Sequence, residues 1–201
     1  MQIISLILAG GQSSRMGRDK AQLPWQGQTL LSYTVQVTRV VTEACYVLTP
    51  WPERYRAQVS GAAFIPETCS GHGPLVGFAQ GLATIAPAQP HLDWLLLLAC
   101  DLPRLDAPLL QQWIEQLTVL ETNMVAAVPH NGDRWEPLCA FYRPTILPEL
   151  KQAIAQNQHS FQTLLSTLNC QPLSISPQQQ TMLWNCNTPA DWQAVVRHSG
   201  R

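Results

Sequence analysis

A short apolar run that stops at a glycine pair constrains this chain more than any other feature. Ile3 to Leu8 is mainly apolar and β-branched, which indicates a strand buried on both faces of a sheet. Gly10 and Gly11 follow, and glycine lets a ligand approach main-chain N–H groups that can hold an anion. Arg15 and Lys20 come next. A glycine loop with two cations after a parallel strand is typical of a phosphate-binding edge in an α/β sheet.

The spacing in this loop excludes two common phosphate-binding motifs. GxxxxGK[ST] fails because Lys20 does not follow a second glycine and has no Ser or Thr behind it. GxGxxG fails because Gln12 stands where the next glycine belongs, which disfavours a dinucleotide-binding dehydrogenase. The plainer alternative is a tight turn followed by two solvated surface charges.

Composition limits the partners and the compartment. With 201 residues, 46% of them hydrophobic and 12% charged, the chain is expected to fold as one domain over residues 1–201. A formal net charge of −1 argues against nucleic acid or an anionic membrane as the main partner. The six scattered cysteines form no CxxC pair, so reduced thiols in a cytoplasmic protein are expected. The longest apolar run, Trp94 to Cys100, is far shorter than the ~20 residues that span a bilayer.

Hydrophobic spacing predicts alternating strands and helices. Apolar residues over Thr29 to Val41 have helical spacing, and a further strand is expected at Ala44 to Leu48. The first strand, this helix and the second strand predict a crossover unit that begins a parallel sheet. Pro172 to Thr181 is rich in Gln, Ser and Pro, and we expect a surface connection there. Further strands are expected at 62–65, 92–99, 124–128 and 138–142, and helices at 53–59, 74–85, 107–120, 144–156, 160–168 and from Pro189.

Asp101 stands at the end of the expected central strand, Leu92 to Ala99. An unpaired carboxylate buried there would be costly, and a metal ion would remove that cost. The alternative is that Asp101 caps the next helix, although Asp106 is better placed for that cap.

Four segments resemble one family. LAGGQSSRMGRDK closely resembles the LAGGxSxRMGxDK signature of nucleotidyltransferases related to molybdenum cofactor guanylyltransferase. GPLVG, CDLP and NCNTPADW follow in that family's order, between residues 73 and 192, and EPLCAFYR resembles its PLxAxY element. The resemblance covers the whole chain and implies a three-layer α/β sandwich with a mostly parallel, Rossmann-like nucleotidyltransferase sheet.

The resemblance also implies roles for individual residues. Arg15, Lys20 and Asp101 would be catalytic, Asp101 would hold Mg²⁺, and Asn185 and Asn187 would lie on the acceptor side. Two positions depart from the family pattern: Glu67 stands where an Asp is common, and Thr49 where some members have Asn. The residues implied to bind the nucleotide are Leu8, Ala9, Gly10, Gly11, Lys20, Glu67, Gly73, Pro74, Leu75 and Asp101.

The implied reaction transfers GMP from GTP to the terminal phosphate of molybdopterin that carries molybdenum, with release of pyrophosphate. Such an acceptor is already an anionic nucleophile, so no general base is required. Arg134, Trp135, Asn185 and Asn187 are the residues we expect to choose the acceptor. The alternatives are a CTP-dependent molybdopterin cytidylyltransferase, a sugar or isoprenoid phosphate nucleotidyltransferase, and a non-catalytic nucleotide-binding module. Transient contact with the molybdenum-inserting enzyme is also expected.

Overall fold

The structure is a computed structural model that describes residues 1–11 and 16–199, and a seven-stranded sheet runs through it. The strand order is β5-β4-β1-β6-β8-β7-β9, with only β8 antiparallel to its neighbours among these strands. The mostly parallel sheet is therefore confirmed. The strands are β1 (Gln2–Leu8), β4 (Ala44–Thr49), β5 (Ala63–Pro66), β6 (Leu92–Ala99), β7 (Ala126–Pro129), β8 (Cys139–Tyr142) and β9 (Cys170–Leu173), and a separate hairpin joins β2 (Pro24–Trp25) to β3 (Gln28–Thr29).

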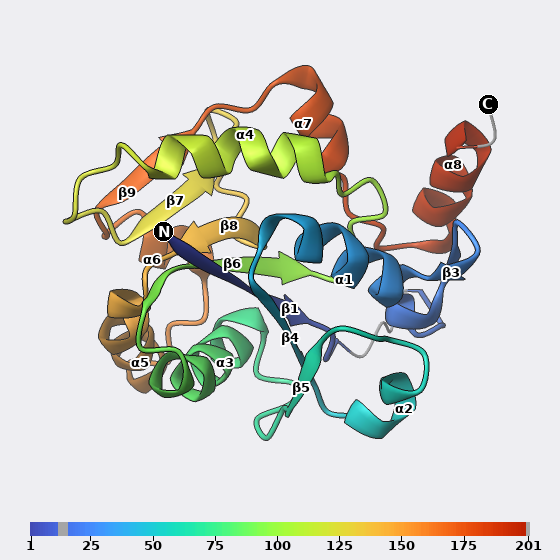
Figure 1. Cartoon of the computed structure of the whole chain (residues 1–201), viewed down its shortest axis with the longest axis horizontal. Coiled ribbons are helices and arrows are strands. Elements are labelled where there is room, and N and C mark those ends of the chain that lie inside the picture. The colour runs from blue at the N-terminus through green and yellow to red at the C-terminus, as the bar shows by residue number, and fades with distance from the viewer. Residues whose placement is uncertain (12–15, 200–201) are drawn as a thin grey trace.

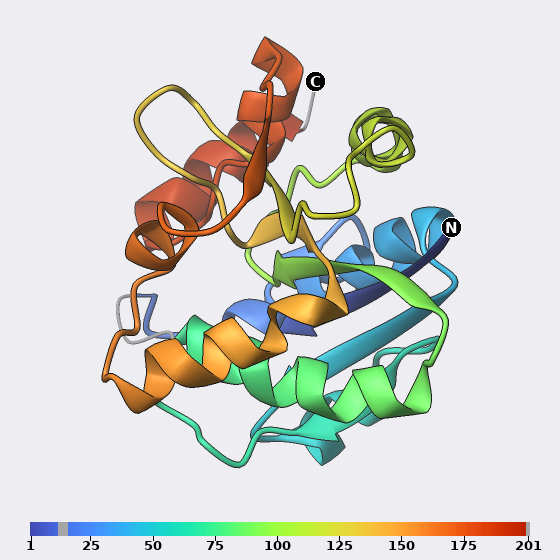
Figure 2. The ribbon, with the colours of Figure 1, turned by 90° about the vertical axis from the view of Figure 1, so that its left-hand side faces the viewer.

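Helices cover both faces of this sheet, which confirms the three-layer α/β sandwich (Figure 1). One core contains residues of α1 (Leu30–Val41), α2 (Pro52–Arg56), α4 (Ala107–Leu117) and α7 (Pro177–Met182). The opposite core contains residues of α3 (Pro74–Ala88), α5 (Leu147–Ala155) and α6 (Phe161–Leu165). Figure 2 shows the layers from the side. Helix α8 (Pro189–Ser199) packs through Val195 on a third, smaller cluster near the hairpin, and two 3₁₀ turns are η1 (Lys20–Gln22) and η2 (Pro144–Ile146).

Strands β1 and β6 have apolar side chains on both faces, as the sequence predicts. Successive residues of β6 alternate between the two cores, with Leu96 in one and Leu97 in the other. In β1, Ile7 and Leu6 divide in the same way. Burial on both faces suits strands in the middle of a parallel sheet.

The chain between residues 170 and 182 differs from the expected surface connection. Cys170–Leu173 is the edge strand β9, which pairs in parallel with β7, and Pro177–Met182 is helix α7. The prediction was wrong because the pairing partner is distant in sequence and because Pro172 looks unsuitable for a strand, although an edge strand tolerates proline. A capping box between Ser176 and Gln179 starts α7.

Other predicted elements exist with shifted ends. Helix α3 continues to Ala88 and includes Pro87 in its last turn. Thr29 and Ser160 cap α1 and α6, where each side chain accepts a hydrogen bond from the backbone N–H three residues later. None of the helices in the described ranges combines the length and the apolar character that a membrane crossing requires.

Candidate active site

The carboxyl ends of β1, β4, β5 and β6 lie at one edge of the sheet, where they open into a cavity of about 450 Å³. Backbone bonds continue past the strand ends: Ala9 N donates to Leu48 O at 2.9 Å, and Cys100 N donates to Leu8 O at 3.3 Å. This is the edge at which open α/β sheets bind ligands. All the residues implied to bind the nucleotide line this cavity except Leu75.

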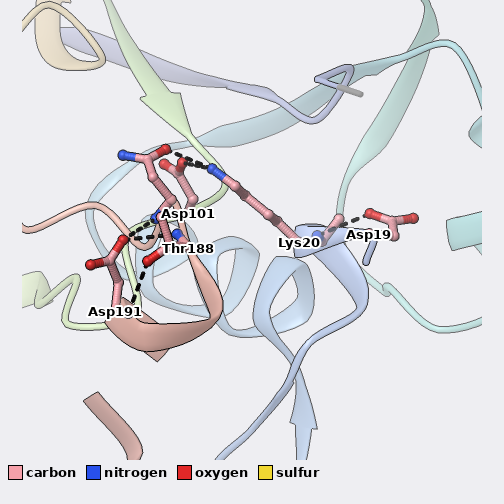
Figure 3. A network of polar contacts seen from close by, with 7 residues as sticks. Asp19, Lys20, Asp101, Thr188 and Asp191 are labelled. Carbon is pink, nitrogen blue, oxygen red and sulfur yellow. Dashed lines mark hydrogen bonds and ion pairs between the residues drawn. The ribbon is translucent and has the colours of Figure 1, made fainter. Parts of the chain in front are cut away.

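Lys20 joins two segments at the cavity that are far apart in sequence. Its Nζ donates to Asp101 Oδ2 at 2.8 Å and to Asn187 Oδ1 at 2.7 Å. Figure 3 shows the lysine side chain pointing toward Asp101. The side chains of Lys20 and Asp101 are only 15% and 14% exposed, so this ion pair is well shielded from water. A cation and a carboxylate that line this cavity are thus joined to the amide of Asn187 outside it.

Asp101 does not cap the following helix. That role belongs to Asp106, whose Oδ1 accepts from Leu109 N at 3.0 Å. Asp101 Oδ2 bonds Lys20, whereas Asp101 Oδ1 is buried without a hydrogen-bond partner among the described residues. A buried carboxylate oxygen without a partner is costly, so the site is suited to a ligand or cation at this atom.

The segment that carries Asn185 and Asn187 is anchored at both ends. Cys186 N donates to the Asp101 carbonyl oxygen at 3.0 Å, which attaches this segment to the end of β6. Asp191 Oδ2 accepts from Asn187 N at 3.0 Å and from Thr188 N at 2.8 Å, while Thr188 Oγ1 accepts from Asp191 N at 3.2 Å (Figure 3). These bonds lower the pKa of Asp191 and keep its carboxylate ionised.

Asp19 fixes the turn from which Lys20 extends, and sequence reasoning did not assign it a role. Its Oδ1 accepts from Ala21 N at 3.1 Å and caps η1. Its Oδ2 accepts from the Tyr55 hydroxyl at 2.7 Å and from the Arg54 guanidinium at 3.3 Å. Burial and the Asp19 carboxylate raise the pKa of Tyr55, so the hydroxyl keeps its proton and donates it to Asp19. The conserved spacing of a motif could not indicate this tie, because α2 lies 36 residues further along the chain.

Glu67 projects into the cavity toward the glycine pair. Its Oε2 is buried with no hydrogen-bond partner in the described structure, and burial raises its pKa. Its backbone is held from both sides: Glu67 N donates to Thr49 O at 2.8 Å, and Gln80 bonds Pro66 O at 2.7 Å and Thr68 N at 3.0 Å. The absence of a side chain at Gly10 leaves room for this carboxylate, because a Cβ there would collide with Glu67 Oε2.

A second cavity, of about 540 Å³, adjoins the first, and Pro74 and Leu138 line both. This second cavity is lined by all four residues that are expected to determine acceptor specificity, namely Arg134, Trp135, Asn185 and Asn187. The two cavities therefore meet close to the Lys20–Asp101–Asn187 contact, which suits a site with two substrates.

Two of the positions noted in the sequence, Leu75 and Thr49, have buried side chains. Leu75 is fully buried in the core beneath α3 and does not line the cavity, so its side chain packs rather than contacts a ligand. Thr49 is also buried, and its hydroxyl accepts from Trp51 N at 3.2 Å. Arg15 lies outside the described residues, and its expected catalytic role stays a prediction.

The thiols near the site are not nucleophiles at neutral pH. Burial, and then the charge of Asp101, raise the pKa of Cys100 to about 12. Burial likewise raises the pKa of Cys186 to about 11. Because the thiolate is the reactive form, neither cysteine supports covalent catalysis.

Sequence and structure comparisons agree on the relatives of this chain. The model of the MobA-like NTP transferase domain matches residues 5–171. A probable molybdenum cofactor guanylyltransferase of Nostoc sp. is 44% identical over 96% of this chain and 90% of the relative. Another, of Synechococcus elongatus, is 40% identical over 97% of this chain and 98% of the relative.

A solved structure has the same fold as this chain. A crystal structure of molybdopterin-guanine dinucleotide biosynthesis protein A from Archaeoglobus fulgidus superposes with a TM-score of 0.78 at 21% identity, covering 98% of each chain. At that identity the likeness establishes the fold. Together with the 40–44% identical relatives and the match over residues 5–171, it shows that the chain belongs to the family of MobA-like NTP transferases.

Proposed function

We propose that this protein transfers GMP from GTP to the terminal phosphate of molybdopterin that carries molybdenum, giving the guanine dinucleotide cofactor and pyrophosphate. The observation that carries the proposal is the pair of adjoining cavities, connected by the hydrogen bond from Lys20, which lines the first, to Asn187, which lines the second. The names of the full-length relatives supply the identity of the two substrates.

The triphosphate lies in the first cavity, over the glycine pair. Backbone N–H groups near Gly10 and Gly11, together with Lys20, hold the phosphates and stabilise the leaving pyrophosphate. We propose that Arg15 supplies a second positive charge for binding the phosphates. A phosphate oxygen of the acceptor, positioned from the Asn187 side, forms a bond to the α-phosphorus as the bond to the bridging oxygen breaks. The protein supplies position and charge, and no side chain has to remove a proton.

The residues at the cavity floor fit a magnesium ion. The described residues contain no cluster of three or more His, Cys, Asp or Glu side chains that could hold a metal. Mg²⁺ in nucleotide sites is commonly held by one or two carboxylates together with substrate phosphates, and Asp101 Oδ1 is a carboxylate atom without a partner in the described structure. When bound, the ion would act as a Lewis acid and neutralise phosphate charge.

Glu67 favours guanine over cytosine at the base. Guanine presents N1–H and a 2-amino group side by side, and one carboxylate can accept from both. Cytosine would place the lone pair of N3 beside the same carboxylate, which is repulsive. The Glu67 oxygen without a partner in the cavity is therefore proposed to read the guanine edge.

The test is a substrate panel. The full chain is incubated with Mg²⁺, molybdopterin and each α-labelled NTP in turn, and labelled dinucleotide and pyrophosphate are measured. Turnover with GTP is expected to exceed turnover with CTP by at least about 100-fold. Product from CTP alone would replace the assignment with a cytidylyltransferase, and product with sugar phosphates but not molybdopterin would replace the acceptor.

Location and further partners complete the proposal. The six cysteines are free thiols, which is the state that the cytoplasm maintains, and we place the reaction there. Transient contact with the molybdenum-inserting enzyme stays a prediction, to be tested by cross-linking of the two purified proteins.

A further inference from the structure

Glu136 lines the second cavity, and it also lines a third cavity, of about 370 Å³, on the side of Trp184. It lines the second cavity together with Trp135 and Arg134, at the turn before β8. Its carboxylate forms no hydrogen bond or salt bridge within the described residues. Burial raises the pKa of Glu136, and the charge of Arg134 opposes that shift. A half-buried carboxylate that makes no hydrogen bond to the described residues, and that lies within the electrostatic influence of Arg134, thus lines a space that can receive a ligand.

The backbone around Glu136 is held in place, so the point from which its side chain extends is fixed. Glu136 N donates to Pro129 O at 2.8 Å. The side chain of Gln162 bonds both polar groups of the preceding residue, because Trp135 N donates to Gln162 Oε1 at 3.0 Å and Gln162 Nε2 donates to Trp135 O at 2.8 Å. Gln80 holds the residues on either side of Glu67 in a similar way. Each cavity therefore contains a glutamate on a backbone fixed by a glutamine.

The two proposed substrates share one chemical edge. Guanine carries an N–H beside an amino group on its pyrimidinone ring, and the pterin of molybdopterin carries the same 2-amino-4-oxo arrangement. A carboxylate accepts both donors at once, and charge-assisted pairs of this kind are stronger than neutral ones. The indole of Trp135, whose ring centroid lies 4.4 Å from that of His130, also lines the second cavity and offers an aromatic surface to a ligand there.

We propose that Glu136 binds the 2-amino-4-oxopyrimidine edge of the pterin acceptor in the second cavity, with the acceptor phosphate extending toward Asn187. The cavity of about 540 Å³ is within the range of small-molecule sites and reaches from Glu136 to Asn187. Glu136 thereby determines acceptor specificity, as Glu67 does for the nucleotide. The inference rests on the proposed function for the identity of the acceptor.

Binding of two ring probes tests the inference without turnover. Pterin has the 2-amino group, whereas lumazine has an oxygen at the same position and would set it against the carboxylate. Both are titrated into the full-length protein by fluorescence, with the first cavity filled by GTP that has a methylene between the α and β phosphates. We expect pterin to bind the unchanged protein roughly 10- to 100-fold more tightly than lumazine.

Glu136→Gln keeps the shape of the side chain and should remove that preference, leaving the two probes within about threefold of each other. Asp133→Asn is the matched control, because Asp133 is an exposed carboxylate on the same loop and does not line the second cavity. It should retain the preference. No preference in the unchanged protein, or a preference that survives in Glu136→Gln, would overturn the inference.

Steady-state kinetics separate this inference from the proposed function. Glu136→Gln should raise KM for molybdopterin roughly 10-fold or more and leave KM for GTP unchanged, which also reports that the fold is intact. If the unchanged protein transfers GMP but the variant has the same molybdopterin KM, the inference alone fails. If the unchanged protein makes no dinucleotide while the pterin preference depends on Glu136, the proposed reaction fails and the pterin site stands.

Discussion

Lys20 Nζ donates hydrogen bonds to both Asp101 Oδ2, at 2.8 Å, and Asn187 Oδ1, at 2.7 Å. The lysine therefore connects the nucleotide side of the site to the segment on the acceptor side. In the proposed reaction, Lys20 would share its positive charge between these two oxygens and the phosphates of GTP. The first two predictions concern this pair.

Asp101→Asn should reduce kcat by at least about 100-fold with little change in thermal stability, because the amide keeps the shape and loses the charge that a magnesium ion requires. Pyrophosphate release under saturating GTP is the measurement. Asp106→Asn is the matched control, since asparagine caps a helix as well as aspartate does. Activity that persists in Asp101→Asn would place the metal elsewhere.

Lys20→Met should raise the dissociation constant for GTP by roughly 10- to 100-fold, because a hydrogen bond to a charged group is lost at a shielded position. Calorimetric titration of the full chain measures the change. Lys151→Met removes the other lysine of the chain from the exposed surface of α5 and should bind GTP normally. Equal affinities of the two variants for GTP would show that Lys20 does not bind the phosphates.

Gly10→Ala should weaken GTP binding mainly by displacing Glu67. A Cβ at Gly10 would collide with Glu67 Oε2 and lie 3.2 Å from Pro50 Cδ. In a Glu67→Ala background the carboxylate is absent, so the same change should cost clearly less. A double-mutant cycle of GTP dissociation constants measures this coupling, and additive effects would show that the two residues act independently.

Glu67→Gln should make the ligand-free protein more stable toward alkaline pH while it weakens GTP binding. Burial raises the pKa of Glu67 above its ordinary value of 4.5, so the folded state holds this proton more tightly than the unfolded state does. The unchanged protein therefore loses stability as pH rises from about 4.5 through the raised pKa, and the full cost of the buried charge persists above it.

Thermal unfolding between pH 4 and pH 8 provides the check on Glu67→Gln. The stability gained by the variant should grow with pH across that window and then level off. Glu115→Gln, on the exposed side of α4, should show no such trend. A constant difference between Glu67→Gln and the unchanged protein at all pH values would mean that the carboxyl is not desolvated.

Local patterns predicted the parts of the fold that depend on nearby residues. The apolar run before Gly10, the strand that ends at Ala99 just before Asp101, and the cap at Asp106 were all predicted, because strand burial and capping act over a few positions. Strand β9 was not predicted. Its partner β7 lies more than forty residues earlier in the sequence, and Pro172 is a residue that does not indicate a strand.

The candidate site divides in the same way. Motif resemblance placed Lys20 and Asn187 in one site, but the direct bond between them, across 167 residues, could be seen only in the structure. The close approach of Glu67 to Gly10 and the hydrogen bond from Tyr55 to Asp19 also join segments that are distant in sequence. Such contacts depend on how side chains meet in space, which periodicity and spacing do not report.

The two cavities draw on different stretches of the chain. Apart from Leu138, the walls of the first come from residues 8–101, whereas those of the second come from residues 134–187 together with Pro74 and Leu102. In the proposed reaction, substitutions in the later stretch would therefore change mainly the cavity for the acceptor, and substitutions in the earlier stretch mainly the cavity for the nucleotide.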